Sequence, residues 1–470
     1  MVNRNAFLKP ESSQRTAAGK GMVQQSATAH EADGAAYTAR TAESRALFER
    51  ASRVLMGGTT RTSVYYPPYP ACMVRGEGCR MYDADGNCYV DFLSNYTVLL
   101  HGHSFPPIVE ALKRQAEQGV CFSAPSEREI ELAEILCKRV DSVDKLRFAS
   151  SGTEAVMYAI RLARAFTGRN MIAKFEGGFH GAYDDCQISH SLSAEQIETS
   201  EAPIKTANTE GLPSGVAERV LVLPFNREAE ACALIEAHAD QLAGVILEPV
   251  QGAGGAIPAE QSFLAALRKT TEKAGILLIF DEIMTFRLGY GGAQQVYGVA
   301  PDLTTFGKII SGGLPLAAFG GREEVMALLD PRNGPPPIPQ SGTFNGSAIA
   351  AAAGVACMEH LTHESLAALE AIGLDMKTRL QAVFAKTGTA AQVNGFGSLF
   401  NIHFSAEPVV DHRGTVGADR EKLARLAMAL LLRGYFMAPR GMICLSTALG
   451  PAEIEGFASA VEDALESGEV

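Results

Sequence analysis

The chain has 470 residues, is 47% hydrophobic and 20% charged, and therefore has the composition of a soluble globular protein with a sizeable core. Its formal net charge is −12 and no basic residues cluster, so we expect no nucleic-acid partner. No apolar run approaches the roughly 20 residues that cross a bilayer, and the first residues lack the apolar core of a secretory signal, so we expect a cytoplasmic protein without a membrane partner.

Residues 1–42 are rich in Ala, Ser, Thr, Gly and Gln and have few large apolar side chains. Such a segment buries too little surface to offset the entropy that it loses on ordering. The sequence therefore predicts a mobile N-terminal extension, to which we assign no role. Residues 43–104 are predicted to join a smaller domain that is formed mainly by the C-terminal part of the chain.

From about residue 105, segments with helical and strand periodicity alternate. Ser126 and Glu129 form a capping-box pattern that predicts a helix reaching about residue 139, and the apolar spacing from Thr153 to Phe166 predicts a second helix. Short apolar runs predict buried, mostly parallel strands at 146–149, 171–175, 220–223, 244–247 and 276–280. This alternation predicts an α/β large domain with a doubly wound sheet over residues 105–345.

A proline-rich stretch from Pro331 to Pro339 predicts a long loop. After it the pattern changes to helices with a few short strands between them. The sequence therefore predicts a smaller α+β domain over residues 346–470, with helices at about 347–360, 363–386, 420–433 and 452–467.

The segment 150–154 (Ser-Ser-Gly-Thr-Glu) joins a predicted strand to a predicted helix. The free N–H groups and the dipole of a helix start attract an anion. Gly152 lets the backbone approach a phosphate closely, and Ser151 and Thr153 add hydroxyl donors. Taken alone, the segment fits an ordinary helix cap better than an anion site.

Three further motifs follow predicted strands. Phe179, between glycines in Gly-Gly-Phe-His-Gly, has the setting to lie flat on a planar ring, or else to be a core residue beside a turn. Asp281 directly follows a buried strand, so it either pairs with a protonated pyridine nitrogen or caps the next turn. Lys308, in Phe-Gly-Lys, offers an amine whose pKa burial would lower enough to attack an aldehyde, or else a point charge for phosphate.

The four motifs are more specific together than alone. A phosphate cradle, a ring-stacking aromatic, an acid for a pyridine nitrogen and an amine nucleophile are the parts that pyridoxal 5′-phosphate (PLP) requires. All four come at strand ends of one predicted α/β domain. The sequence therefore predicts a PLP enzyme with its cofactor on Lys308.

The segments SGTEA, GGFHG, LEPVQG, FDEIMTFR and FGKIISGGLPLAAFGG together resemble class III aminotransferases of PLP fold type I, over about residues 45–465. The resemblance implies a homodimer with active sites at the subunit interface, and an amino acid and a 2-oxo acid as substrates. It makes Lys308 the Schiff-base lysine and Asp281 the partner of the pyridine nitrogen. Thr343 would reach the phosphate of the neighbouring subunit. The implied cofactor-binding residues are Ser151, Gly152, Thr153, Phe179, His180, Glu248, Gln251, Asp281, Lys308 and Thr343.

Two branches of this family compete: β-amino-acid aminotransferases, such as those for β-phenylalanine, and glutamate-1-semialdehyde aminomutases. The segment around Arg61 (GTTRTSV) resembles one whose arginine binds a β-amino-acid carboxylate. The segment around Arg440 (MAPRG) resembles one whose arginine binds the carboxylate of a 2-oxo acid. Tyr96 is expected in the pocket wall, and Arg287 in a structural ion pair. We therefore expect amino transfer from a β-phenylalanine-like donor to 2-oxoglutarate or pyruvate, with a mutase or another class III amine transaminase as the alternative.

The sequence argues against two other functions, a non-catalytic regulator and a metal site. A PLP-fold regulator without catalysis would need an N-terminal DNA-binding segment, and residues 1–42 are short and poor in apolar residues. The pair His101 and His103 lacks a third ligand at supporting spacing, so we expect no metal there. The nine cysteines are scattered and never form C-x-x-C, which favours free thiols in a reducing compartment.

Overall fold

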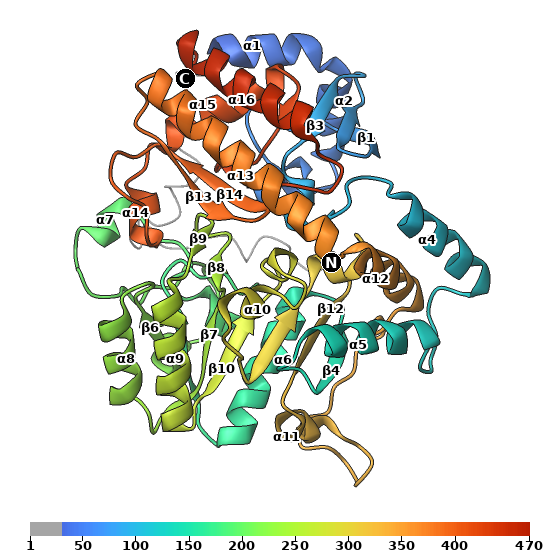
Figure 1. Ribbon diagram of the computed structural model, residues 1–470, viewed down its shortest axis with the longest axis vertical. Coiled ribbons are helices and arrows are strands. Elements are labelled where there is room, and N and C mark those ends of the chain that lie inside the picture. Colours follow the sequence, from blue (N-terminus) through green and yellow to red (C-terminus); the bar gives the residue numbers. More distant parts are fainter. Residues whose placement is uncertain (1–30) are drawn as a thin grey trace, which may run out of the picture.

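A seven-stranded sheet forms the centre of the large domain, the lower part of the molecule in Figure 1. In the computed structural model, which describes residues 31–470, its strands are β4 (Lys145–Ala149), β5 (Met171–Phe175), β6 (Val220–Leu223), β7 (Leu242–Leu247), β10 (Leu277–Asp281), β11 (Leu303–Phe306) and β12 (Ala317–Gly321). Their order is β4-β12-β11-β10-β7-β5-β6. Strand β12 is antiparallel to both neighbours, and the remaining pairs are parallel. The predicted mostly parallel α/β sheet is therefore confirmed.

Helices cover both faces of this sheet because its strands are apolar on both sides. Along β10, Leu278 and Phe280 pack towards helices α8 (Glu228–Ala237) and α9 (Gln261–Ala274). The alternate residues Leu277 and Ile279 pack towards α6 (Gly152–Thr167) on the other face. This sandwich fixes the carboxyl ends of β4, β5, β10 and β11 at one edge, where the four motifs emerge.

The helices of the large domain begin close to where their sequence signals place them. The Ser126 hydroxyl accepts from the Glu129 N–H, and the Glu129 carboxylate accepts from the Ser126 N–H, so the capping box opens α5 (Glu127–Arg139) as predicted. The other helices of this part are α4 (Pro106–Gln118), α7 (Ala194–Ile197), α10 (Ala293–Tyr297) and α11 (Glu323–Met326). A two-stranded ribbon consists of β8 (Val250–Gln251) and β9 (Ile257–Pro258).

The second domain, the upper part of Figure 1, combines both ends of the described chain. Strands β1 (Met73–Glu77), β2 (Arg80–Asp83) and β3 (Cys88–Asp91) form a sheet with β15 (Tyr435–Phe436). Strands β13 (Gln392–Phe396), β14 (Leu399–His403) and β16 (Met442–Cys444) form another. The helices of this domain include α2 (Ala42–Ala51), α13 (His363–Lys386), α14 (His412–Val416), α15 (Arg420–Leu432) and α16 (Pro451–Glu466).

Residues 31–42 differ from the predicted mobile extension. Helix α1 (Glu31–Arg40) packs on α15, and its Tyr37 is only 1% exposed. The Tyr37 ring lies 5.4 Å from that of Tyr69, and the Arg40 guanidinium donates to the Leu432 carbonyl over 2.7 Å. One aromatic anchor thus orders a segment whose average composition predicts mobility. The prediction for residues 1–30 lies outside the described residues.

Helix α12 (Ala348–His360) connects the two domains. It packs on α4, α5 and the turn Lys308–Ser311, whereas α13, which follows it, packs on α16. We therefore propose a domain boundary near residue 361, after the one predicted at 345/346. No helix of the described residues is long and apolar enough to cross a membrane.

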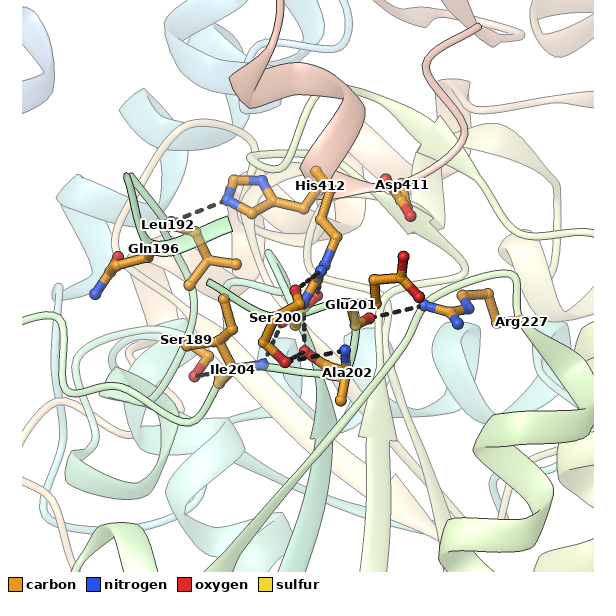
Figure 2. A network of polar contacts seen from close by, with 12 residues as sticks. Ser189, Leu192, Gln196, Ser200, Glu201, Ala202, Ile204, Arg227, Asp411 and His412 are labelled. Atoms are coloured by element: carbon orange, nitrogen blue, oxygen red, sulfur yellow. Dashed lines mark hydrogen bonds and ion pairs between the residues drawn. The ribbon is translucent and has the colours of Figure 1, made fainter. Parts of the chain in front are cut away.

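An ion pair links the two domains at the loop of residues 189–204, which Figure 2 shows with Asp411 and His412 next to it. Arg413 of α14 pairs with Glu176, which follows β5, with 2.8 Å between Nε and Oε2. Its guanidinium also donates to the carbonyls of Ser200 and Ala202, both over 2.6 Å. Next to it, the His412 ring accepts from the Leu192 N–H. The small domain thus clamps the loop that follows β5.

Arg413→Ala is expected to lower the free energy of unfolding by about 3 kcal/mol, because it leaves the Glu176 carboxylate buried without its cation. Denaturant unfolding measures this change. The control is Arg379→Ala, which breaks an ion pair whose side chains are 40% and 41% exposed and should cost under about 1 kcal/mol. Equal losses in the two variants would contradict the role of the Glu176–Arg413 pair as a clamp.

Candidate active site

An anion cradle forms where β4 meets α6. Ser151 caps the helix, and its hydroxyl accepts from the Glu154 N–H over 3.3 Å. Within the described chain, the N–H groups of Gly152 and Thr153 donate to no protein acceptor. A Cβ on Gly152 would lie 2.7 Å from Cδ1 of Ile283, so any larger residue would require the Ile283 side chain to shift. The open N–H groups at the start of a 16-residue helix suit a phosphate.

Asp281 lies at the end of β10 and is buried. One carboxylate oxygen is 2.8 Å from Nδ1 of His180, and the other accepts from the Ile283 N–H and the Thr305 hydroxyl. Burial lowers the pKa of His180 and Asp281 opposes that shift. A neutral His180 donating through Nδ1 orients the Asp281 carboxylate, and it leaves Nε2 buried without a partner among the described residues.

Lys308 follows β11 with a backbone φ of 51°, in the left-handed region that L residues rarely adopt. Burial lowers the pKa of its amine, Asp281 and Glu248 oppose this shift, and Arg440 adds to it. No hydrogen bond or ion pair engages Nζ of Lys308 within residues 31–470. The amine is therefore unengaged and close to two carboxylates and a guanidinium, as a nucleophile requires.

Glu248 and Gln251 hold the loop that carries Phe179. The Glu248 carboxylate accepts from the N–H groups of Phe179, over 3.0 Å, and Gly252, over 3.1 Å. Burial, with a further contribution from Asp281, raises the pKa of Glu248 to about 8. The Gln251 amide donates to the Glu176 carbonyl, which leaves its Oε1 buried and unpaired in the described chain. The ring of Phe179 stays 44% exposed and free to cover a ligand.

Two arginines flank the ring of Tyr96. The guanidinium carbon of Arg440 is 5.2 Å from the ring centroid, and that of Arg61 is 5.9 Å from it. Arg61 is exposed, whereas desolvation by the surrounding protein lowers the pKa of Arg440. The guanidinium group of arginine is a cation in proteins. The site therefore has two cations beside one aromatic wall, from segments almost 380 residues apart in sequence.

The family model for class III aminotransferases matches residues 62–442. The chain is a class III aminotransferase. It is 38% identical to a glutamate-1-semialdehyde 2,1-aminomutase of Methanobrevibacter smithii, over 90% of this chain and 98% of that one. It is also 38% identical to a β-phenylalanine transaminase of Variovorax paradoxus, over 90% and 93%. The structure of an ω-transaminase from Sphaerobacter thermophilus superposes with a TM-score of 0.87 at 46% identity, covering 90% and 97%.

This aminotransferase is a PLP-dependent transaminase, and its site fits the cofactor. The unpaired atoms Nε2 of His180 and Oε1 of Gln251 are buried polar groups that a bound polar ligand would satisfy. The open helix start at Gly152 suits the phosphate, and the Asp281 carboxylate suits a protonated ring nitrogen. The Lys308 amine, which has no partner in the described chain, is free to bond the aldehyde carbon of the cofactor.

Arg287 of the aminotransferase corrects one prediction. The sequence placed it in an ion pair, yet it meets no carboxylate among the described residues. Its buried guanidinium donates to the Ser398 hydroxyl over 2.8 Å, to the Thr97 carbonyl over 3.1 Å, and to the Leu445 carbonyl. Every residue has a backbone carbonyl, so the sequence does not indicate which carbonyls an arginine will contact. The partners of Arg287 could therefore not be predicted from its charge.

Thr343, His101 and His103 form no hydrogen bond with the predicted cofactor residues in the described chain. Thr343 is exposed on the loop before α12, and its carbonyl accepts from the Cys121 thiol over 3.7 Å. His103 bonds Asp91 over 2.8 Å, and His101 lies between the Thr447 hydroxyl and the Cys357 carbonyl. No group of three metal-ligating side chains occurs in residues 31–470.

Asn345 and Asn95 are two residues that sequence reasoning missed. The Asn345 side chain is 3.1 Å from the Ser150 hydroxyl, and Asn95 accepts from Arg61 over the same distance. Two neighbours in the sequence could have drawn attention to them. Asn345 comes two residues after Thr343, and Asn95 is adjacent to Tyr96. Neither position predicts a partner by itself, because both partners are distant in the sequence.

Proposed function

We propose that this aminotransferase moves the amino group of a β-amino acid, of the β-phenylalanine kind, to a 2-oxo acid such as 2-oxoglutarate or pyruvate. The pair of arginines around Tyr96 is the observation that carries the proposal. Arginine binds a carboxylate through two parallel hydrogen bonds. A β-amino acid has its carboxylate one carbon further from the amine than an α-amino acid has, so an enzyme that takes both classes benefits from two binding points.

The two arginines differ in their exposure and in the groups around them. Arg440 is close enough to Lys308 to lower the pKa of the amine, which favours the short 2-oxo acid. Arg61 is exposed and lies 5.9 Å from the centre of the Tyr96 ring, which favours a role in binding the longer β-amino acid. The similarity to a β-phenylalanine transaminase supports the same assignment.

The cofactor residues follow from the same geometry. PLP, when bound, delocalises the negative charge that develops on the substrate carbon as its proton leaves. In our proposal Nζ of Lys308 anchors the cofactor and moves that proton, and Asp281 holds a proton on the ring nitrogen. Phe179 covers the ring, with His180, Glu248 and Gln251 around it. The helix start at Ser151, Gly152 and Thr153 holds the phosphate.

A homodimer is part of the proposal. The exposed large apolar side chains include two groups along the chain, in residues 54–65 and 120–122, and a single one at Phe344. Exposed apolar surface of this kind marks an interface. Phe344 is adjacent to Thr343, which in the dimer would reach the phosphate in the partner subunit. All nine cysteines are unpaired, which supports a reducing, cytoplasmic location.

A glutamate-1-semialdehyde aminomutase is the second candidate, because such a mutase is equally similar in sequence. An assay of the purified enzyme with β-phenylalanine and 2-oxoglutarate or pyruvate, beside one with glutamate 1-semialdehyde, separates the two. Amino transfer from β-phenylalanine is the expected result. Turnover of glutamate 1-semialdehyde alone would reject the proposal in favour of the mutase.

Arg61→Ala should lower kcat/KM for the β-amino acid by roughly 30-fold, because a charge-assisted hydrogen bond contributes about 1.5–3 kcal/mol. Arg440→Ala should lower kcat/KM for the 2-oxo acid by a similar factor. Single-turnover measurements of each half-reaction test both variants. Arg75→Ala, at an exposed pair with Glu77 on β1, is the control and should leave both halves unchanged. Equal losses in both halves for each variant would reject the division of roles.

A further inference from the structure

Four consecutive residues beside the two arginines have left-handed backbone conformations. Ser94, Asn95, Tyr96 and Thr97 have φ values of 50°, 48°, 57° and 80°, and none of them is glycine. L residues avoid this region because Cβ approaches a carbonyl oxygen, and they enter it singly rather than in runs. A run of four persists only where the surroundings hold it, and such strained segments gather at functional sites.

Both ends of this left-handed turn are held by buried groups. At its start, one oxygen of Asp91 accepts from the N–H groups of Leu93, over 2.8 Å, and Ser94, over 2.9 Å. The second oxygen of Asp91 bonds His103 over 2.8 Å. At its end, Arg287 donates to the Thr97 carbonyl. Since Arg287 follows β10, the strand of Asp281, the turn is fixed to the frame of the cofactor site.

The turn presents two side chains to the segment that carries Arg61. Oδ1 of Asn95 accepts from Nη1 of Arg61 over 3.1 Å. The Tyr96 hydroxyl donates to the Ser63 carbonyl over 2.5 Å, which fixes the backbone two residues further on. No carboxylate pairs with Arg61 in residues 31–470. The only polar side chain that orients this guanidinium in the described chain is thus a neutral amide.

We propose that Asn95 is a positioning residue for donor recognition, which aims the Arg61 guanidinium at the substrate carboxylate without neutralising it. This inference rests on the proposed function. An acid at position 95 would orient Arg61 equally well but compete with the substrate for its charge. Asparagine supplies the acceptor and is among the residues that best tolerate the left-handed region. The anchored turn keeps that acceptor in place before the donor binds, which lowers the ordering cost of binding.

Asn95→Gly tests the proposal, because glycine keeps the left-handed conformation and removes only the acceptor. We expect kcat/KM for β-phenylalanine to fall about tenfold more than kcat/KM for 1-phenylethylamine, which has no carboxylate, mainly through KM. Titration calorimetry should show about tenfold weaker binding of 3-phenylpropanoate, the donor without its amine. Equal losses for both amines would show a merely structural role and overturn the proposal.

The double variant Arg61→Ala/Asn95→Gly separates this inference from the proposed function. If Asn95 acts through Arg61, the double variant binds 3-phenylpropanoate no more weakly than Arg61→Ala alone. Additive losses would overturn the inference while leaving the proposed function intact. If wild type transfers no amino group from β-phenylalanine, the proposed function fails. The same comparison, made with any carboxylate-bearing donor that the enzyme accepts, then still decides the role of Asn95.

Discussion

Lys308→Ala is expected to lower kcat of both half-reactions by about 10⁴-fold, the upper range for removal of a group that transfers protons in the transition state. The Lys308 amine is unengaged in the described chain, and burial keeps its pKa below that of a free lysine. Burial thus favours the neutral amine, which is the form that acts as a nucleophile and a base. Lys174, the fully buried lysine of the described chain, donates to the carbonyls of Phe175 and Ile188 and is therefore not free to replace it. Stopped-flow measurement of each half-reaction tests this prediction.

Lys308→Arg is the matched variant for this prediction. Arginine keeps the positive charge and a similar length, but it stays protonated at any accessible pH and cannot act as a base. We expect it to lose as much activity as Lys308→Ala, while the visible absorbance of the bound cofactor shifts in both. Activity near the wild-type level in Lys308→Arg would show that the charge of residue 308 matters rather than its amine.

The local parts of the fold were predictable because their signals are short-range. The strand at 171–175 and the helix at 363–386 were predicted with the bounds that β5 and α13 have. The capping box at Ser126 depends on residues three apart. Asp281 and Lys308 were predicted from motifs at strand ends, and parallel pairing of β10 with β11 brings these ends together. Here local pattern and tertiary structure agree.

The parts that escaped prediction depend on long-range partners. Helix α1 is ordered because the ring of Tyr37 packs against the rings of Tyr66 and Tyr69, about 30 residues further along the chain. Arg287 reaches carbonyls of residues 97 and 445 instead of an acid. The left-handed run from Ser94 contains no glycine that would have marked it. In each case the conformation depends on contacts between residues far apart in the sequence, which local patterns do not predict. Tertiary contacts here override the local conformational preference.

Asp281→Asn is expected to lower kcat by about 10³-fold in both half-reactions. Two unit charges about 4 Å apart interact by about 4 kcal/mol at the effective dielectric of a protein site, and that energy corresponds to about 10³ in rate. In our proposal the carboxylate would pair with the protonated ring nitrogen, and the amide would remove that charge while placing a donor or a neutral acceptor against His180. Asparagine has the same shape, so the contacts with Ile283 and Thr305 lose little. The kcat of each half-reaction, with cofactor content measured by absorbance, tests the prediction.

Asp302→Asn is the matched control, since Asp302 is also a buried acid beside the sheet but lies at the opposite end of β11. It accepts from the guanidinium groups of Arg268 and Arg322, both over 2.8 Å, so its loss should lower the melting temperature and leave kcat within about twofold. A large fall of kcat in Asp302→Asn would mean that any buried charge in this sheet controls the rate. A normal kcat in Asp281→Asn with cofactor bound would remove Asp281 from the catalytic set. Comparison of the two variants therefore tests whether the chemistry requires the charge at position 281 in particular or any buried carboxylate in this sheet.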